Sequence, residues 1–387
     1  MKVVQIYNTL NTIVKEVLGE QTIVNEDLSN IVDVGTSIFN ANAVDNYVRT
    51  LCDVIGKMVF VNRPYMGSAP KVLMDAWEFG SVLEKIQMDM PQAEENESWE
   101  LQDNTVYEQD MFYKPTITVT FFNSKTTFEV PISITEKQVK ESFYGPQQMN
   151  AFIEMIYSTI DKSMTVKTDA LVMRTINNMI ALTLNDDYPT ASYTTTSGVK
   201  AINLLKLYND KFSTSLTTDK VLTTPDFIRF ATYTMSLYID RIGKISTLFN
   251  IKGKERFTPT QYLHFILLND FAKASSIYLQ SDTYHKELIA LPNYETVPYW
   301  QGSGTSYAFN DISTINIKAN TGSGTVNVNA SGILGIMFDR DALGVTNFDK
   351  RVTNHYNGKA EFWNYWFKQD ASYFNDMSEN AIVFFVA

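Results

Sequence analysis

One stretch of this 387-residue chain, residues 145–182, constrains the fold more than any other. Apolar side chains recur there at steps of three and four residues, which places them on one side of a 3.6-residue helix. They are Met149, Phe152, Ile153, Ile156, Ile160, Met164, Leu171, Ile176, Met179 and Ile180. Gly145-Pro146 marks the start, because proline fits the first turn of a helix. Such a helix would be roughly 55 Å long, so we predict a spine on which other elements pack.

The apolar pattern weakens at residues 166–168, where we allow a kink. The alternative is two ordinary core helices that are joined near Lys167.

Composition limits the classes of function that this chain can have. The formal net charge of −11 argues against nucleic-acid binding as the main task, although a protein can surround DNA without gripping it. The chain contains 24 Phe, 21 Tyr and 5 Trp, which favours extensive packing within or between subunits. The lone Cys52 permits no internal disulfide. Residues 1–18 form an amphipathic pattern unlike a signal peptide, and no apolar run is long enough to span a membrane.

An acidic segment lies between Lys85 and Lys114, which enclose no other Lys or Arg. Its carboxylates are Asp89, Glu94, Glu95, Glu97, Glu100, Asp103, Glu108 and Asp110. One interpretation is a projecting loop that docks on a basic patch of a neighbour. The other is a solvated loop, which is the more common fate of a run of like charges.

Alternating apolar residues after this loop predict two strands, 117–121 and 128–134. The short polar link 123–126 between them predicts that they pair as a β-hairpin. Pro131 places the second strand at the edge of a sheet or at a bulge, because proline cannot donate to the strand ladder. Thr135-Glu136 then marks a helix start.

The rest of the chain mixes helices and strands. Residues 225–242 and 258–272 are predicted to be helical, and residues 312–317 and 326–328 to be strands. We also predict strands at 333–338 and at 381–387, the second of them buried.

No catalytic or metal-binding pattern is found. His264, His285 and His355 do not lie at ligand spacing from each other or from Cys52, and no zinc motif occurs. The string from Ser68 to Lys71 lacks the companion motifs of a serine acyl enzyme. We therefore predict no enzyme activity, no catalytic residues, no cofactor and no metal.

The sequence resembles tailed-phage major capsid proteins. The resemblance rests on residues 128–182, where an alternating strand leads through a short linker into the long helix, and on the strings Gly335 to Leu343, Phe362 to Phe367 and Asn380 to Phe385. Trp363-Asn364-Tyr365 and Asn380-Ala381 are most similar to the head proteins of small short-tailed phages of the picovirus type.

This resemblance implies an α+β, HK97-like capsid fold. The parts would be an N-terminal arm (1–70), an extended β-hairpin loop (71–130), a peripheral domain (131–189) with the spine helix at 145–182, an axial domain (190–332), and a return to the peripheral domain with the closing strands (333–387). Some relatives add an immunoglobulin-like domain, which we do not expect here. Residues 86–113 contain no lysine, so we expect no covalent cross-link from the extended loop.

The implied function is that of a structural subunit. Copies would assemble into pentamers and hexamers of an icosahedral capsid that encloses double-stranded DNA without sequence-specific binding, made in the bacterial cytoplasm and kept in the virion. Further partners would be a portal protein and scaffolding or decoration proteins, and no membrane. Candidate contacts between subunits are Glu94, Glu95, Glu97, Trp99, Trp363, Tyr365 and Trp366. Alternatives are an encapsulin-like compartment shell and an enzyme with an unrecognised site.

Overall fold

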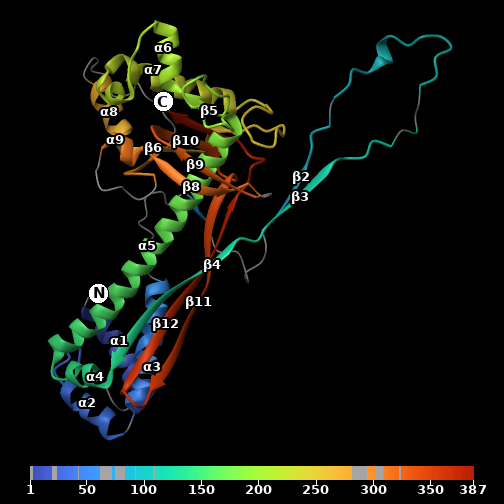
Figure 1. Ribbon diagram of the computed structural model, residues 1–387. Helices are drawn as coiled ribbons and strands as arrows, with labels where there is room; N and C mark the ends of the chain where they lie inside the picture. The colour runs from blue at the N-terminus through green and yellow to red at the C-terminus, as the bar shows by residue number, and fades with distance from the viewer. Residues whose placement is uncertain are drawn as a thin grey trace. The chain divides into compact units, whose positions relative to one another are not determined.

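The computed structural model describes residues 3–19, 24–41, 43–61, 72–74, 83–91, 93–107, 110, 112–280, 294–300, 308–321 and 324–387. The chain divides into two compact units, each of which mixes helices and strands (Figure 1). Unit 1 comprises Met1–Gly80, Lys125–Val172 and Val345–Ser372. Unit 2 comprises Ser81–Ser124, Met173–Gly344 and Tyr373–Ala387.

The predicted spine is one unbroken helix, α5 (Pro146–Asp187), which begins at the predicted proline and continues from unit 1 into unit 2. Every apolar residue of the predicted stripe is buried. The two-helix alternative is wrong, because the helix continues through residues 166–168. Up to Met164 the helix buries one side, whereas between Leu171 and Leu184 it is buried on almost every side. The weakened pattern therefore marks a change in how the helix is buried.

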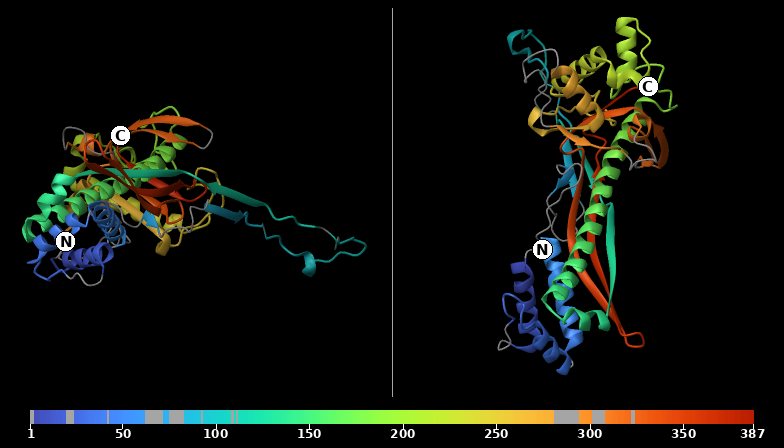
Figure 2. Two further views of the ribbon diagram at one scale, coloured as in Figure 1. Left: turned by 90° about the horizontal axis from the view of Figure 1, so that it is seen from below. Right: turned by 90° about the vertical axis from the view of Figure 1, so that its left-hand side faces the viewer.

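In the described part of the chain before β1, unit 1 contains the helices α1 (Val3–Leu18), α2 (Ile31–Asn40) and α3 (Val44–Val61). They lie beside the N-terminal turns of α5 in both views of Figure 2. Apolar residues of all three helices share one hydrophobic core with α5, including Leu10, Ile38 and Leu51. The described part of the expected N-terminal arm is thus packed into unit 1, because its amphipathic faces have an apolar side of α5 to cover. Residues 62–70 of that expected arm lie outside the described residues.

The sheet of unit 1 has the strand order β1-β11-β12-β4. Its strands are β1 (Leu73–Met74), β11 (Leu343–Asn357), β12 (Phe362–Asn375) and β4 (Lys125–Thr135). β4 is an edge strand, as Pro131 predicted, and Pro131 stands opposite Trp366 of β12. The strand leads into α4 (Glu136–Ser142) through a capping box, in which Thr135 and Gln138 each bind the other's backbone N–H.

The predicted hairpin is wrong, although both of its strands exist. β3 (Ile117–Phe122) pairs with β2 (Leu83–Met88), and β4 pairs with β12. The link at residues 123–124 carries the chain from one sheet to the other, where Ser124 accepts a backbone hydrogen bond from Tyr373. Both predicted partners are taken by strands that are distant in sequence.

Unit 2 is organised around a second sheet with the order β5-β13-β10-β6-β7. Its strands are β5 (Ala201–Asn203), β13 (Ala381–Phe385), β10 (Ile333–Asp339), β6 (Leu263–Leu268) and β7 (Tyr294–Val297). The helices around it are α6 (Leu204–Phe212), α7 (Pro225–Ile242), α8 (Asn269–Gln280) and the short α9 (Phe309–Ile312). The predictions of α7, β10 and β13 are confirmed.

One predicted helix of unit 2 is wrong. Residues 258–272 were expected to be helical, but Leu263–Leu268 form the strand β6, with five of its six side chains buried. A fully buried strand has no alternation, so its apolar run cannot be told from a helix by periodicity. The hairpin of β8 (Ile315–Asn320) and β9 (Thr325–Ala330) matches the two strands predicted nearby.

Residues 333–387 were expected to return as a whole to the domain of the spine. Their middle part, which includes most of β11 and β12, belongs to the sheet of unit 1. Their two ends, β10 and β13, instead pair with each other in the sheet of unit 2.

Gly332, just before β10, offers a test of this packing. Its φ is +79°, and a Cβ atom there would lie 2.0 Å from the Val386 carbonyl oxygen. Both the left-handed backbone and the clash penalise a side chain, so we expect Gly332→Ala to lower the free energy of unfolding by roughly 2–4 kcal/mol. The matched control is Gly324→Ala, because a Cβ atom at Gly324 would meet nothing within 4 Å. Urea unfolding of the unassembled subunit measures both, and equal midpoints for the two variants would contradict this account.

Candidate intersubunit surface

The ribbon of β2 and β3 carries the long acidic segment, and we call it the ribbon. Its strands are antiparallel, with Ile86 opposite Val119 and Met88 opposite Ile117. The described residues between 89 and 116 continue from its end and project away from the rest of unit 2 (Figure 1). The ribbon is therefore the base from which the extended loop leaves its subunit.

The two faces of the ribbon differ in a way that a strand pattern dictates, since successive side chains point to opposite sides. The inner face is half-buried and largely polar, with Leu83, Lys85, Gln87, Thr118, Thr120 and Phe122. The outer face is exposed and mostly apolar, with Glu84, Ile86, Met88, Ile117, Val119 and Phe121. The usual arrangement of a surface strand, with its apolar side inward, is reversed.

Lys85 anchors the inner face. Its ammonium lies 2.8 Å from an oxygen of Asp376 and 2.8 Å from an oxygen of Glu379. The Asp376 side chain is 1% exposed and the Glu379 side chain 11% exposed, so water screens this cluster weakly. Hydrogen bonds to charged groups are among the stronger ones in proteins. The ribbon is thus fixed to the segment between β12 and β13.

Gln87 and Asp89 extend this anchor. The Gln87 side-chain amide donates to Glu379 (2.9 Å), and its oxygen accepts from Arg256 (2.6 Å). Both carboxylate oxygens of Asp89 accept from the Lys254 ammonium, at 2.8 and 2.9 Å. Lys85, Gln87 and Asp89 lie on one face of the chain, and each forms an ion pair or a hydrogen bond with the rest of unit 2.

The environment shifts the pKa values of the three central groups. Burial alone would lower the pKa of Lys85, but the hydrogen bonds and charges of Asp376 and Glu379 raise it above its usual value. Burial disfavours the Asp376 carboxylate, yet Lys85 and Ser378 hold its pKa below 3.8. The pKa of Glu379 is raised above 4.5 by burial and by the nearby Asp339, in spite of the Lys85 contact.

The loop beyond the ribbon also exposes large apolar side chains. Trp99, the last residue of the short 3-10 helix Glu97–Trp99, is 96% exposed. Phe112 is 87% exposed, and Leu101, Val106 and Tyr113 are exposed as well. Exposed apolar groups in this number on one projecting segment are typical of surfaces that bind another molecule.

The candidate contact residues that the sequence predicts lie in two different places, the extended loop and the strand β12. Glu94 and Glu95 are exposed in the loop, and Trp99 lies in the same segment. The side chain of Glu97 lies outside what the structure describes. Glu94, Glu95 and Trp99 thus lie in the loop that continues from the ribbon.

The aromatic candidates Trp363, Tyr365 and Trp366 lie on β12 in unit 1. Trp363 and Tyr365 are buried in the core of unit 1, where the Trp363 indole N–H donates to Asp45. Their side chains serve the packing of their own subunit, which a count of aromatics could not reveal. Trp366 points to the other face of the strand and is half-buried.

Sequence reasoning missed both faces of the ribbon. The alternation Leu-Glu-Lys-Ile-Gln-Met at 83–88 was a usable strand signal. It gave no indication of Asp376 and Glu379 as partners of Lys85, because they lie almost 300 residues further along the chain.

Almost the whole sequence can be assigned to a protein family. A model of the Phi29-like phage major capsid protein family matches residues 10–385. The chain belongs to this family. No curated protein matches it.

Among solved structures, this capsid protein is similar to a chain in the capsid of Staphylococcus phage Andhra, with 10% identity, a TM-score of 0.51, and coverage of 84% of this chain and 85% of that one. A structure titled for the head fiber and inner core protein gp22 of bacteriophage P68 contains another similar chain, with 8% identity, a TM-score of 0.49, and coverage of 84% and 86%. The capsid of the cyanophage P-SCSP1u contains a third, with 10% identity, a TM-score of 0.44, and coverage of 82% and 86%.

The capsid protein has the HK97-like fold and is a structural component of the phage capsid that self-assembles. No helix in the described ranges is both long and apolar enough to cross a membrane. Across the same ranges, no group of three His, Cys, Asp or Glu side chains is placed to hold a metal ion.

Lys85→Met tests the anchor. It leaves the buried Asp376 without its cation and leaves Glu379 with only the more distant Arg256, at 3.5 Å, so we expect the free energy of unfolding to fall by about 3–5 kcal/mol. The control is Lys206→Met, because the Lys206–Asp210 pair is an exposed helix pair of the same unit and should contribute less than about 0.5 kcal/mol. Urea unfolding of unassembled subunits compares the two, and similar losses would show that the anchor is no stronger than a surface pair.

The pH dependence of Asp376 gives a second test. Because its folded pKa lies below 3.8, the carboxylate stabilises the fold at higher pH and this contribution is lost as the pH falls through the folded pKa. We expect the difference in unfolding free energy between the native chain and Asp376→Asn to be constant above about pH 5 and to shrink below it. Denaturant unfolding of both proteins at several pH values above and below pH 5 measures this difference. A difference that grows on acidification would have the wrong sign.

Proposed function

We propose that the capsid protein forms the pentamers and hexamers of an icosahedral shell, and that the ribbon and its loop lie over an adjacent subunit of the ring. The observation that carries this proposal is the reversed ribbon, with its polar face anchored and its apolar face outward. A subunit that worked alone would gain nothing from such a surface, since exposed apolar area favours association. Closed shells use repeated contacts of this heterologous kind.

The strength of one ribbon contact suits assembly. Burial of a Val, Ile, Met or Phe side chain contributes about 1.5–3 kcal/mol, from which the ordering of the partners is subtracted. One ribbon would then contribute a modest contact. A shell repeats that contact many times, so individually weak contacts give a stable particle that can still correct errors during growth.

The loop favours docking over a purely solvated role. Charge alone left both interpretations open, and the exposed aromatic residues support docking. A solvated acidic loop has no physical reason to carry Trp99, Phe112 and Tyr113 in water. We propose that the loop lies on a neighbouring copy, with Glu94, Glu95 and Glu97 facing basic groups there. Trp366 remains a weaker candidate contact on the face of β12.

The content of the shell follows from charge. With a net charge of −11, the subunit would enclose double-stranded DNA without sequence-specific binding, since affinity for phosphates depends on Lys and Arg. Packaging would need a portal protein, and scaffolding or decoration proteins would assist assembly, which takes place in the host cytoplasm. We assign unit 1 to the peripheral domain and unit 2, without the ribbon and loop, to the axial domain. No enzymatic step is required for any of these roles.

An encapsulin-like compartment would use the same fold around a protein cargo. The family match favours a phage shell over a compartment. The nucleic-acid content of purified particles distinguishes the two.

The outer face of the ribbon can be tested with Ile86→Thr/Val119→Thr. Threonine keeps the branched shape that strands favour, so the subunit should remain folded while the contact loses apolar area. We expect the protein concentration needed for assembly to rise about tenfold or more. The matched control is Ile277→Thr on α8, a side chain that is 64% exposed, compared with 66% for Ile86. Sedimentation and negative-stain electron microscopy measure particle yield.

The expected result requires that both variants unfold at the same denaturant concentration as the native chain. Normal assembly of the double variant would contradict the ribbon contact. An equal loss in the control would show that apolar exposure in general, and no particular face, controls assembly.

A further inference from the structure

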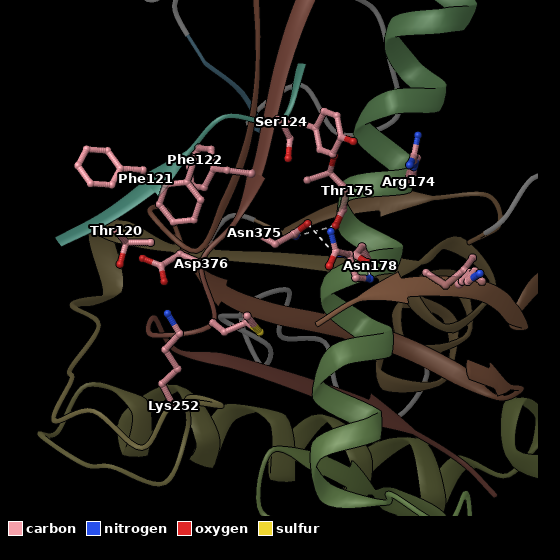
Figure 3. Close-up of a pocket in the computed structure, with 16 residues that line it drawn as sticks. Thr120, Phe121, Phe122, Ser124, Arg174, Thr175, Asn178, Lys252, Asn375 and Asp376 are labelled. Carbon is pink, nitrogen blue, oxygen red and sulfur yellow. Dashed lines mark hydrogen bonds between the residues drawn. The ribbon is translucent and has the colours of Figure 1, made fainter. Parts of the chain in front are cut away.

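Unit 2 contains a cavity of about 570 Å³ between the base of the ribbon, α5, the hairpin of β8 and β9, and the end of β12 (Figure 3). Its volume is within the roughly 300–1,000 Å³ typical of pockets that hold a compact ligand. One wall is polar, since Asn178 donates to Asn375 (2.8 Å) and Asn375 donates to the Thr175 carbonyl. The other wall is aromatic, with the Phe122 and Phe374 ring centroids 5.2 Å apart. Phe121, from the outer face of the ribbon, also lines this cavity.

Three cations line the cavity: Arg174, Lys252 and Lys318. All are exposed, and within the described ranges none forms an ion pair. The Arg174 guanidinium lies 5.6 Å from the centre of the Tyr373 ring, which also lines the cavity. Among the described residues of the lining, Asp376 is the only carboxylate, and it is already bound by Lys85 and Ser378. The cavity therefore has a local excess of positive charge in a chain that is strongly negative overall.

The chain itself contains a segment with the complementary chemistry. The tip of the extended loop, residues 93–107, carries Glu94, Glu95 and Glu100 within five residues of the exposed Trp99 in the sequence. Apart from Asp89 at the ribbon, the described acidic groups of the loop form no ion pair. Tryptophan in a pocket with charges at the rim is the arrangement that most often dominates binding between proteins.

We propose that the cavity of each subunit receives the loop tip of a second copy, with the Trp99 indole inside and the flanking carboxylates against Arg174, Lys252 and Lys318. The inference rests on the proposed function, because it identifies where the loop of a neighbour docks. The occupant comes from another copy because the loop leaves the ribbon in the direction away from its own unit (Figure 1). Each arm of the loop has about 14 residues and can extend up to about 45 Å, enough to reach across an adjacent subunit.

Cross-linking between copies tests the inference. One population of the full-length protein carries Glu95→Cys or Glu100→Cys, and a second carries Lys252→Cys or Lys318→Cys. The populations are assembled together and treated with a short bis-maleimide. Cys52 is buried and does not compete. The control population carries Lys244→Cys, an exposed lysine of the same unit that does not line the cavity.

We expect covalent heterodimers from at least one loop and cavity pair, at about tenfold the yield obtained with the control, because docking raises the local concentration of the two thiols. Cross-links confined to single chains would show that the loop folds back on its own subunit. Yields equal to that of the control would show that the loop docks elsewhere. Either result overturns the inference.

Charge reversal separates this inference from the proposed function. We expect Glu94→Lys/Glu95→Lys/Glu100→Lys and Lys252→Glu/Lys318→Glu each to reduce assembly about tenfold, and their combination in one chain to restore it. If the loop variant assembles poorly and the cavity variant assembles normally, the loop docks on a neighbour but the cavity is not its receptor. If both variants assemble normally while the Ile86/Val119 variant does not, the ribbon contact remains and the inference fails. If the cavity variant alters only the DNA content of particles, the cations face nucleic acid and the inference is overturned.

Discussion

The placement of Lys85 between two buried carboxylates is the interaction on which the extended loop depends. An ammonium on the inner face of a surface strand is expensive to bury, and only the partners Asp376 and Glu379 make its burial tolerable. Those partners come from the turn between β12 and β13, which the second sheet holds in place through β13. The ribbon is therefore fixed by charge and geometry, and its attachment uses no apolar area from the outer face.

The inner face of the ribbon attaches it to its own subunit and the outer face stays free, which explains why the apolar side chains point outward. If Ile86, Val119 and Phe121 were needed to attach the ribbon to its own subunit, they would be unavailable to a neighbour. A polar anchor also specifies one register, because a slip of one residue would turn Lys85 and Gln87 outward and bury Ile86 against carboxylates. The same slip would remove the apolar surface from the outside. One register of β2 therefore both attaches the ribbon to its subunit and keeps its apolar face exposed.

The parts of the fold that the sequence predicted are those encoded by local patterns. The spine helix, the helix start at Thr135 and the helix α7 follow from periodicity and end signals within a few turns. The predictions failed where a partner lies far along the chain. Adjacency in sequence predicts that β3 and β4 pair with each other, and the apolar run of β6 resembles a helix pattern because a central strand is apolar on both faces.

The candidate surface shows the same limit. An excess of acidic residues is visible in any sequence, so Glu94 and Glu95 could be proposed as contacts before the structure was known. Exposure is a property of the whole fold: Trp99 and Trp363 are both tryptophans near polar residues, yet one is 96% exposed and the other 4%. Lys252 and Lys318 stand out only once folding brings them to one cavity with Arg174.

Segregation of charge within one subunit gives assembly a direction. Two acidic loops repel each other, and an acidic loop is likewise repelled by most of a surface whose net charge is negative. A cation-lined cavity is then a place where a loop can approach at low electrostatic cost, and the exposed indole adds affinity only after close approach. Salt weakens the first effect within a Debye length of about 8–10 Å and leaves the second almost unchanged. Charge would thus select which surfaces meet, and apolar burial by the ribbon and Trp99 would decide how firmly they stay together.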